Sequence, residues 1–238
     1  MQFFSYYNKF LETDASAVII SISKLILLHF PCLEIKDYTK QKSINFSEND
    51  FLKLHFIKED ISCINNFKTF KKQIDWIAGK LAAKLLINHK EKIGFNLKDI
   101  SVSYKKGGAP YFSAYSNYNL SISHSGDLAV AVISDNNIGI DIEKIEGAKS
   151  SEFINIAFSD NEIKALQTKY VTDFYVNWCI KEAYLKYIEK GFDENLKNIE
   201  ILGNFVFHNN NKVDNLNIKT TIINSNYALA LVTNYFNM

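Results

Sequence analysis

Apolar and polar positions alternate in several parts of the chain, and this two-residue period predicts strands. It predicts short extended segments at residues 100–104 and 110–113, followed by strands near 119–124, 128–134 and 137–143. Two further alternating stretches cover 198–208 and 218–236, with turns expected at Gly203-Asn204 and at Asn224-Ser225-Asn226.

Helical spacing of apolar residues appears between these strands. We expect helices at residues 47–57, 61–89, 151–157, 159–169 and 172–190. Helices and strands are mixed and joined by short hairpin links, so the pattern favours the α+β class over a doubly wound parallel sheet.

The apolar run AVIISISKLILLHF, which starts at residue 17, predicts core segments. Lys24 and His29 interrupt it, and it is shorter than the ~20 residues that a membrane helix needs. No basic segment with a cleavage signal precedes it, so we expect no secretion signal and no membrane association.

Composition narrows the picture further. The chain has 238 residues, enough for one large or two small domains, and 47% of them are hydrophobic, which can fill a core. The net charge of +1 gives no reason to expect nucleic acid or an anionic membrane as a partner. Arginine is absent, so every anion contact must come from a flexible lysine ammonium or a neutral donor.

The three cysteines, Cys32, Cys63 and Cys179, lack the close pairing of a zinc site. Their odd number and wide spacing indicate structural, reduced thiols, and we expect a cytoplasmic protein.

Two pairs of similar segments indicate an internal duplication. FSENDFLKL from Phe46 resembles FSDNEIKAL from Phe158, and in both a serine precedes an acidic residue by three positions, as at helix starts. The segment from Trp76 resembles the segment from Trp178 in the same order. We therefore expect two related halves, 1–115 and 116–238, and a monomer, because a duplicated chain needs no symmetric partner to complete a site.

The segment GIDIE carries the first candidate chemistry. Side chains alternate along a strand, so Asp141 and Glu143 share one face while Ile140 and Ile142 point to the core. Two carboxylates side by side suit Mg²⁺, although a solvated strand face would look the same. The pair therefore needs further partners.

The helix FYVNWCIKEAYLKYIEK offers such partners. Glu182 and Lys186 are four residues apart on one helix face, where an ordinary surface ion pair is the alternative interpretation. In the first half, Lys80 takes the place that Glu182 has in the second. That exchange is expected if one half binds a metal and the other binds phosphate.

The segment SISHSGD contains Ser123, His124 and Ser125. Adjacent strand residues face opposite ways, and the spacing is not that of a nucleophile elbow, so a hydrolase dyad is disfavoured. His124, near Gly126, either donates a hydrogen bond to a phosphate or is a structural histidine whose hydrogen bonds are made within the protein.

Five motifs in this order resemble the large, Sfp-type class of 4′-phosphopantetheinyl transferases. They are GGAPYF (107–112), LSISHSGD (120–127), GIDIE (139–143), FSDNE (158–162) and WCIKEAYLK (178–186). The pairing of GIDIE with W-x-x-K-E-A-x-x-K is the most specific part. The resemblance implies two similar subdomains in a pseudo-two-fold arrangement, each a small, mainly antiparallel sheet packed with helices.

The resemblance also implies an activity and a set of site residues. The reaction would move the phosphopantetheine arm of coenzyme A to a serine of an acyl or peptidyl carrier protein and release adenosine 3′,5′-bisphosphate. Asp141, Glu143 and Glu182 are similar to the family's Mg²⁺ ligands, and Asp141, Glu182 and Lys186 to its catalytic residues, with Glu182 as general base. The implied coenzyme A ligands are His124, Ser123, Lys181, Lys186, Lys80, Lys84, Lys105 and Lys106.

One position departs from the family pattern. The family has a lysine in its G-K-P motif where this chain has Ala109, between Gly108 and Pro110. The loss of one charge-assisted contact costs about 1.5–3 kcal/mol, so weaker coenzyme A binding is expected unless Lys105 or Lys106 compensates.

Two other functions stay open from the sequence. One is another Mg²⁺-dependent enzyme that cleaves a pyrophosphate with the same carboxylates. The other is a noncatalytic module that binds coenzyme A or a carrier protein, which Ala109 supports and the intact set of Asp141, Glu143, Glu182 and Lys186 disfavours.

Overall fold

The computed structural model describes residues 2–30, 35–92, 94, 96–166, 170–191 and 194–234. Its two main sheets have the orders β1-β2-β6-β5 and β11-β12-β7, and two small sheets are formed by β3-β4 and β10-β9-β8. All pairings within them are antiparallel. The strands are β1 (Phe4–Tyr7), β2 (Ser16–Ser21), β3 (Val102–Tyr104), β4 (Pro110–Phe112), β5 (Asn119–Ser125), β6 (Leu128–Ser134), β7 (Ile138–Lys144), β8 (Ile199–Leu202), β9 (Phe205–His208), β10 (Asn211–Lys212), β11 (Leu216–Ile223) and β12 (Tyr227–Asn234).

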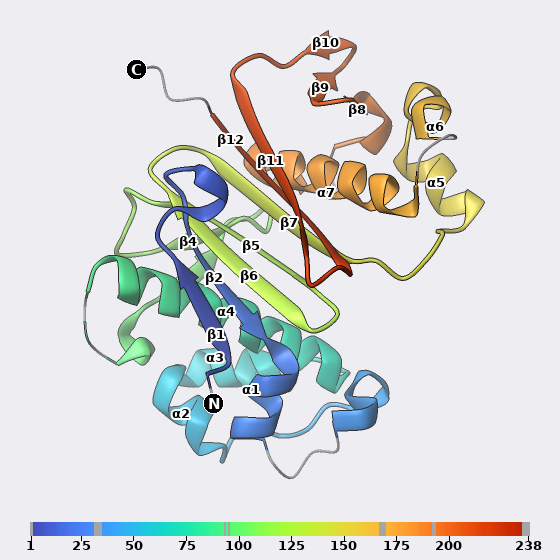
Figure 1. Cartoon of the computed structure of the whole chain (residues 1–238). Coiled ribbons are helices and arrows are strands. Elements are labelled where there is room, and N and C mark those ends of the chain that lie inside the picture. Colours follow the sequence, from blue (N-terminus) through green and yellow to red (C-terminus); the bar gives the residue numbers. More distant parts are fainter. Residues whose placement is uncertain are drawn as a thin grey trace.

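The long helices α4 and α7 pack on the outer sides of the two main sheets (Figure 1). The helices are α1 (Ile22–His29), α2 (Asp50–His55), α3 (Lys58–Asn65), α4 (Phe70–Lys90), α5 (Ser151–Ala157), α6 (Asp160–Leu166) and α7 (Val171–Tyr187). Short 3₁₀ turns lie at Phe10–Glu12, Ile35–Lys40, Leu97–Asp99 and Leu196–Asn198. The predicted α+β class is therefore confirmed.

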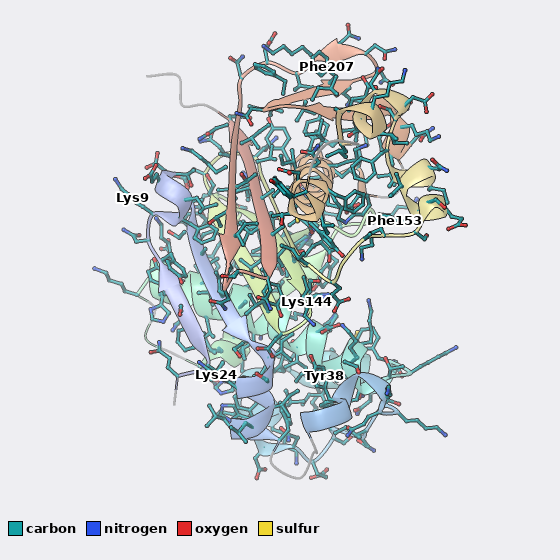
Figure 2. All side chains as sticks on the ribbon, turned by 45° about the vertical axis from the view of Figure 1, so that its right-hand side comes forward. Lys9, Lys24, Tyr38, Lys144, Phe153 and Phe207 are labelled. Atoms are coloured by element: carbon teal, nitrogen blue, oxygen red, sulfur yellow. The ribbon has the colours of Figure 1, made fainter. Side chains whose placement is uncertain are left out.

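Alternation along the strands produces four layers: α4, the first sheet, the second sheet and α7. In β6, Ala129, Ala131 and Ile133 join the core under α4, whereas Val130 and Val132 face the second sheet. The apolar core between the two sheets also contains Ile140, Ile142, Leu229 and Leu231. The core under α7 takes the alternate residues of β12, Ala228, Ala230 and Val232. Figure 2 shows the two ends of the molecule at Tyr38 and Phe207, with Lys144 at the end of β7 between them.

The predicted boundary between residues 115 and 116 does not divide the sheets. Strands β5 and β6 follow it in the sequence, yet β6 pairs along its length with β2 from the N-terminal part. The main sheets separate after Ser134, in the turn before β7. The sequence could not indicate this pairing. Partners in a hairpin are neighbours in the sequence, whereas β2 and β6 are more than 100 residues apart.

The order of elements repeats along the chain. Two short helices, a long helix, a 3₁₀ turn and two strands occur as α2, α3, α4, 97–99, β3 and β4, and again as α5, α6, α7, 196–198, β8 and β9. Lys84 on α4 donates to the carbonyl of His55, the last residue of α2, and to the carbonyl of Leu97 in the 3₁₀ turn after α4, both at 3.0 Å. Lys181 on α7 makes the same two contacts with α5 and its 3₁₀ turn, at 2.8 and 3.2 Å.

These contacts correct the equivalences drawn from sequence. The Lys84 ammonium lies 5.0 Å from the ring centre of Phe56, and that of Lys181 lies 4.8 Å from Phe158. Phe158 therefore corresponds to Phe56, not Phe46. Lys84 corresponds to Lys181, so Lys80 does not occupy the place of Glu182.

Most predicted elements are present, with two differences. The helix expected at 61–89 is two helices, because the Thr69 side chain caps a new helix start by accepting from the backbone N–H of Lys72. The helix expected from residue 47 begins at Asp50, capped by Asn49 and not by Ser47. The second capping box is confirmed: Ser159 and Glu162 exchange hydrogen bonds at the start of α6. The last residues of the helix expected at 159–169 lie outside the described part of the chain.

The apolar run from residue 17 forms β2 and α1, as expected for core segments. In the part of the chain that the structure describes, no helix is long and apolar enough to cross a membrane. Cys63 is an exposed free thiol and Cys179 a buried one, and Cys32 lies outside the described residues.

Candidate active site

Two adjoining cavities, with volumes of about 490 and 290 Å³, are lined by residues of α4, β5, α7 and the turn between β3 and β4. Both are lined by Gly108, Pro110, Ile122, Glu182 and Lys186, so together they form one cleft. The larger part extends to α4 and to His124 on β5. The cleft thus collects residues from both long helices, α4 and α7.

The two carboxylates of β7 lie beside this cleft: neither lines a cavity, but Asp141 is bonded to Lys186, which lines both. Asp141 is 5% exposed, and its Oδ1 accepts hydrogen bonds from Ser123 Oγ and Lys186 Nζ, both at 2.7 Å. Glu143 Oε2 accepts from Ser125 Oγ at 2.8 Å. The intervening residues Ile140 and Ile142 are fully buried between the sheets, so the predicted alternation along GIDIE is confirmed.

Helix α7 brings Glu182 and Lys186 to the same cleft. Lys186 Nζ donates to the Ile140 carbonyl at 3.0 Å and to Asp141, so it reaches across to β7. Burial, and after it the nearby charge of Asp141, raise the pKa of Glu182 to about 7 against the lowering effect of Lys186. The interpretation of an ordinary surface ion pair is therefore wrong.

The three carboxylates influence one another. Burial raises the pKa of Glu143, and the Asp141 charge acts in the same direction, while hydrogen bonds from Ser125 and Trp178 lower it. Within the described ranges, Oδ2 of Asp141 and Oε1 of Glu182 are buried without a hydrogen-bond partner. Uncompensated carboxylate oxygens beside raised pKa values indicate a place for a cation.

Among the residues that the structure describes, no group of three or more His, Cys, Asp or Glu side chains could hold a metal ion in its present arrangement. Mg²⁺ usually takes one or two carboxylates and completes its octahedral shell with water and substrate phosphates. Asp141 and Glu182 fit that requirement through their unpartnered oxygens, as a partial ligand set.

His124 lies on the wall of the larger cavity. Its Nδ1 is 3.8 Å from Oδ2 of Asp75. Burial lowers the pKa of His124 against the raising effect of Asp75, and Lys186, Lys71 and Lys72 lower it as well. A neutral imidazole ring among lysines can donate one N–H to an anion.

Two predicted phosphate ligands are wrong. Lys181 is fully buried and its ammonium is used by Glu162 Oε2 at 2.7 Å and by two backbone carbonyls. Lys84 is 1% exposed and donates to two carbonyls, with Asp60 Oδ2 at 3.9 Å. Neither ammonium lines the cleft, because each is held by backbone carbonyls of a neighbouring short helix and 3₁₀ turn.

The other predicted lysines are placed differently. Lys80 lines the larger cavity, with its ammonium 2.6 Å from Asp60 Oδ1 and 4.6 Å from the Trp76 ring centre. Lys105 pairs with Glu189 at the end of α7, at 2.6 and 2.7 Å, and Lys106 is exposed. Lys105 is therefore committed to a carboxylate and does not simply replace the lysine missing at position 109.

Sequence reasoning missed Ser125, Asp60 and Asp75. The alternation Ser121-x-Ser123-x-Ser125 was a signal for Ser125, because it puts three hydroxyls on one strand face. No comparable signal existed for the two aspartates, since their partners Lys80 and His124 come from other elements.

Comparison with known proteins agrees with the motifs. Residues 137–232 match the family model of the 4′-phosphopantetheinyl transferase superfamily. A 4′-phosphopantetheinyl transferase of Bacillus subtilis is 37% identical over 105 residues, which cover 41% of this chain and 45% of that protein. The L-aminoadipate-semialdehyde dehydrogenase-phosphopantetheinyl transferase of Xenopus laevis is 30% identical over 141 residues, covering 52% of this chain and 46% of that protein.

The chain spans less than half the length of each of these curated relatives. A solved structure, the holo-[acyl-carrier-protein] synthase of Thermotoga maritima, is 18% identical with a TM-score of 0.32, covering 41% of this chain and 62% of that one, and this likeness is too weak to carry an argument. The predicted resemblance to the superfamily is thereby confirmed for residues 137–232.

Proposed function

We propose, taking the match of residues 137–232 to the 4′-phosphopantetheinyl transferase superfamily as the premise, that this chain transfers the phosphopantetheine arm of coenzyme A to a serine of an apo acyl or peptidyl carrier protein. Adenosine 3′,5′-bisphosphate is the other product. The observation that carries the proposal is that Glu182 and Lys186 line one cleft and that Asp141 is bonded to Lys186 beside it. Among the described residues, Asp141 and Glu182 each keep a buried, unpartnered oxygen.

Asp141, Glu143 and Glu182 are the residues that would hold Mg²⁺. Bound there, Mg²⁺ supplies positive charge against the pyrophosphate oxygens of coenzyme A. Lys186 places a further positive charge beside Asp141, where charge develops during phosphoryl-type transfer.

Glu182 is the proposed general base. Without a cation, the pKa of this carboxylate is raised to about 7. A bound cation would lower it, so that the group is ionised and can accept the proton of the attacking serine hydroxyl of the carrier. The same burial limits the access of bulk water to the Glu182 carboxylate. Loss of this group removes both the base and one cation ligand.

The wall formed by α4 and β5 is the proposed site for the coenzyme A phosphates. His124, Lys72 and Lys80 line the larger cavity, and Ser123 lies at its floor. Lys105 and Lys106 lie on the adjacent turn between β3 and β4. Neutralisation of Lys80 by Asp60 and the alanine at position 109 reduce the charge available there, so modest affinity is expected.

The proposal includes the organisation of the whole protein. The repeated order of elements and the matching environments of Lys84 and Lys181 support two related subdomains in a pseudo-two-fold arrangement. A cleft completed within one chain supports a monomeric enzyme, and reduced thiols support a cytoplasmic location.

The test mixes the protein, Mg²⁺ and coenzyme A with a panel of apo carrier proteins and measures the intact mass of each carrier. We expect the mass of one phosphopantetheine arm to be added. Asp141→Asn and Glu182→Gln are each expected to lower the rate at least ~100-fold, a size typical for loss of a charge-stabilising group. Glu152→Gln, on the exposed surface of α5, is the matched control and keeps the wild-type rate. Full activity of both cleft variants would refute the site.

A further inference from the structure

Strands β5 and β7 lie side by side where the two main sheets meet (Figure 1). Their contact is made by side chains of β5 and the backbone of β7. The hydroxyls of Ser121, Ser123 and Ser125 accept hydrogen bonds from the backbone N–H groups of Ile140, Ile142 and Lys144, at 3.1, 3.4 and 3.0 Å. The residue numbers rise together, so the strands run parallel, with one serine for each second residue of β7.

Two of these hydroxyls have a second partner. Ser123 Oγ donates to Asp141 Oδ1, and Ser125 Oγ donates to Glu143 Oε2. A hydroxyl has one proton, and the backbone N–H occupies its acceptor side, so the proton is directed at the carboxylate. Ser121 differs, because the corresponding residue of β7 is Gly139, which has no side chain.

Each hydroxyl therefore fixes one oxygen of its carboxylate. Oδ1 of Asp141 is engaged by Ser123 and Lys186, which leaves Oδ2 for a cation. Oε2 of Glu143 is engaged by Ser125, and Trp178 is a further donor to this carboxylate, so its orientation is fixed as well. A carboxylate held in this way cannot rotate freely to chelate with both oxygens.

Cations differ in how they use carboxylates. Mg²⁺ requires nearly ideal octahedral geometry with ligands at about 2.1 Å, whereas Ca²⁺ accepts six to eight oxygens, including bidentate carboxylates, in flexible geometry. A site whose carboxylates cannot chelate with both oxygens favours the smaller ion.

We propose that Ser123 and Ser125 are positioning residues that fix the orientation of the Asp141 and Glu143 carboxylates against bidentate chelation, and that they thereby set a preference for Mg²⁺ over Ca²⁺. This inference rests on the proposed metal site and adds a role that neither the motifs nor the family match assigns to Ser125.

Isothermal titration calorimetry with the full chain and coenzyme A measures the affinities for Mg²⁺ and for Ca²⁺ separately. Ser123→Ala and Ser125→Ala are expected to lower Mg²⁺ affinity about tenfold, as is usual for partners of metal ligands, with a smaller effect on Ca²⁺. Ser121→Ala loses the same kind of backbone contact without freeing a carboxylate, so its Mg²⁺ to Ca²⁺ ratio stays at the wild-type value. Ser125→Thr keeps the hydroxyl and restores the ratio.

An equal ratio in Ser125→Ala and Ser121→Ala, with wild-type Mg²⁺ binding intact, would overturn the inference and leave the proposed function standing. Failure of the wild-type protein to bind Mg²⁺ would overturn both. If Ser125→Ala does not fold, Ser125→Cys tests the same point, since a thiol of similar size is only a weak donor. Its ratio is then expected to fall, and an unchanged ratio counts against the inference.

Discussion

The two buried lysines show how one residue type can take a structural or a functional part in this fold. Lys84 and Lys181 each lie beneath a phenylalanine ring and donate to backbone carbonyls at the end of a short helix. Their partners come from segments at least 13 residues away, so helical spacing could not distinguish them from cleft lysines. Lys186, five residues after Lys181 on α7, does reach the cleft.

Lys84 gives a pH-dependent prediction. Burial lowers its pKa from 10.5 to about 8, against the attraction of Asp60. Between these two values the unfolded chain holds the proton more tightly, so stability rises with pH from about 8 to 10.5. The total for a fully realised shift of this size is about 3 kcal/mol.

Urea unfolding of the wild type and Lys84→Met at pH 7, 8, 9 and 10 measures this contribution. The wild type is expected to gain stability relative to the variant across the upper part of the range. Parallel curves for the two proteins would show that the lysine keeps an ordinary pKa in the folded state.

The candidate site was predictable from sequence at the residues that share one element. Asp141 with Glu143, and Glu182 with Lys186, follow from strand and helix periods. What the periods could not supply was how each carboxylate is oriented, because that depends on hydroxyls from β5. The partners Asp60 and Asp75 were missed for the same reason.

At the scale of elements, the contact between β7 and α7 is the one that brings the carboxylates together. It is close because Gly139 has no side chain: a Cβ there would lie 1.9 Å from the Ala183 carbonyl oxygen and 2.6 Å from the Tyr187 nitrogen. Both obstacles are backbone atoms, which cannot move aside as a side chain can. The glycine in GIDIE is thus required for packing.

Gly139→Ala is accordingly expected to destabilise the protein by at least ~3 kcal/mol, the upper end for overpacked sites, or to prevent folding. Gly107→Ala is the matched control, since its nearest contact would be an ordinary 3.6 Å, and a change within about 0.5 kcal/mol is expected. Chemical denaturation measures both. Equal stability of the two variants would contradict the close approach of β7 to α7.

Element prediction succeeded where a single period ran between clear turns, as in β5, β6, β7 and α7. It failed at residues 66–69, because an apolar pattern continued through the break between α3 and α4 and only the Thr69 cap marks the new start. Strand β1 was missed because four residues are too few to show alternation.

At the scale of the whole molecule, the fold divides after β6, between residues 135 and 136. Residues up to 134 contain the complete first sheet with α4, and the rest contains the second sheet with α7. A division after residue 115 instead separates β2 from its partner β6 and splits the core under α4.

Coexpression of two fragments tests this division. Fragments 1–135 and 136–238 are expected to purify together as a folded complex, because each keeps one sheet intact and the apolar layer between the sheets joins them. Fragments 1–115 and 116–238 are expected to give much less complex. Equal recovery from both pairs, judged by copurification and circular dichroism, would show that the sheets are not the folding units.

The serine contacts between β5 and β7 have a consequence for how such a protein can change over time. Backbone hydrogen bonds join paired strands whatever their side chains are. The contact between β5 and β7 instead depends on a hydroxyl side chain at three positions, Ser121, Ser123 and Ser125. A single substitution at Ser123 or Ser125 would weaken the contact between β5 and β7 and also change the proposed preference between Mg²⁺ and Ca²⁺, although no cation ligand is replaced. Selection on metal supply and selection on stability would therefore act together on Ser123 and Ser125, whereas Ser121 would affect stability alone.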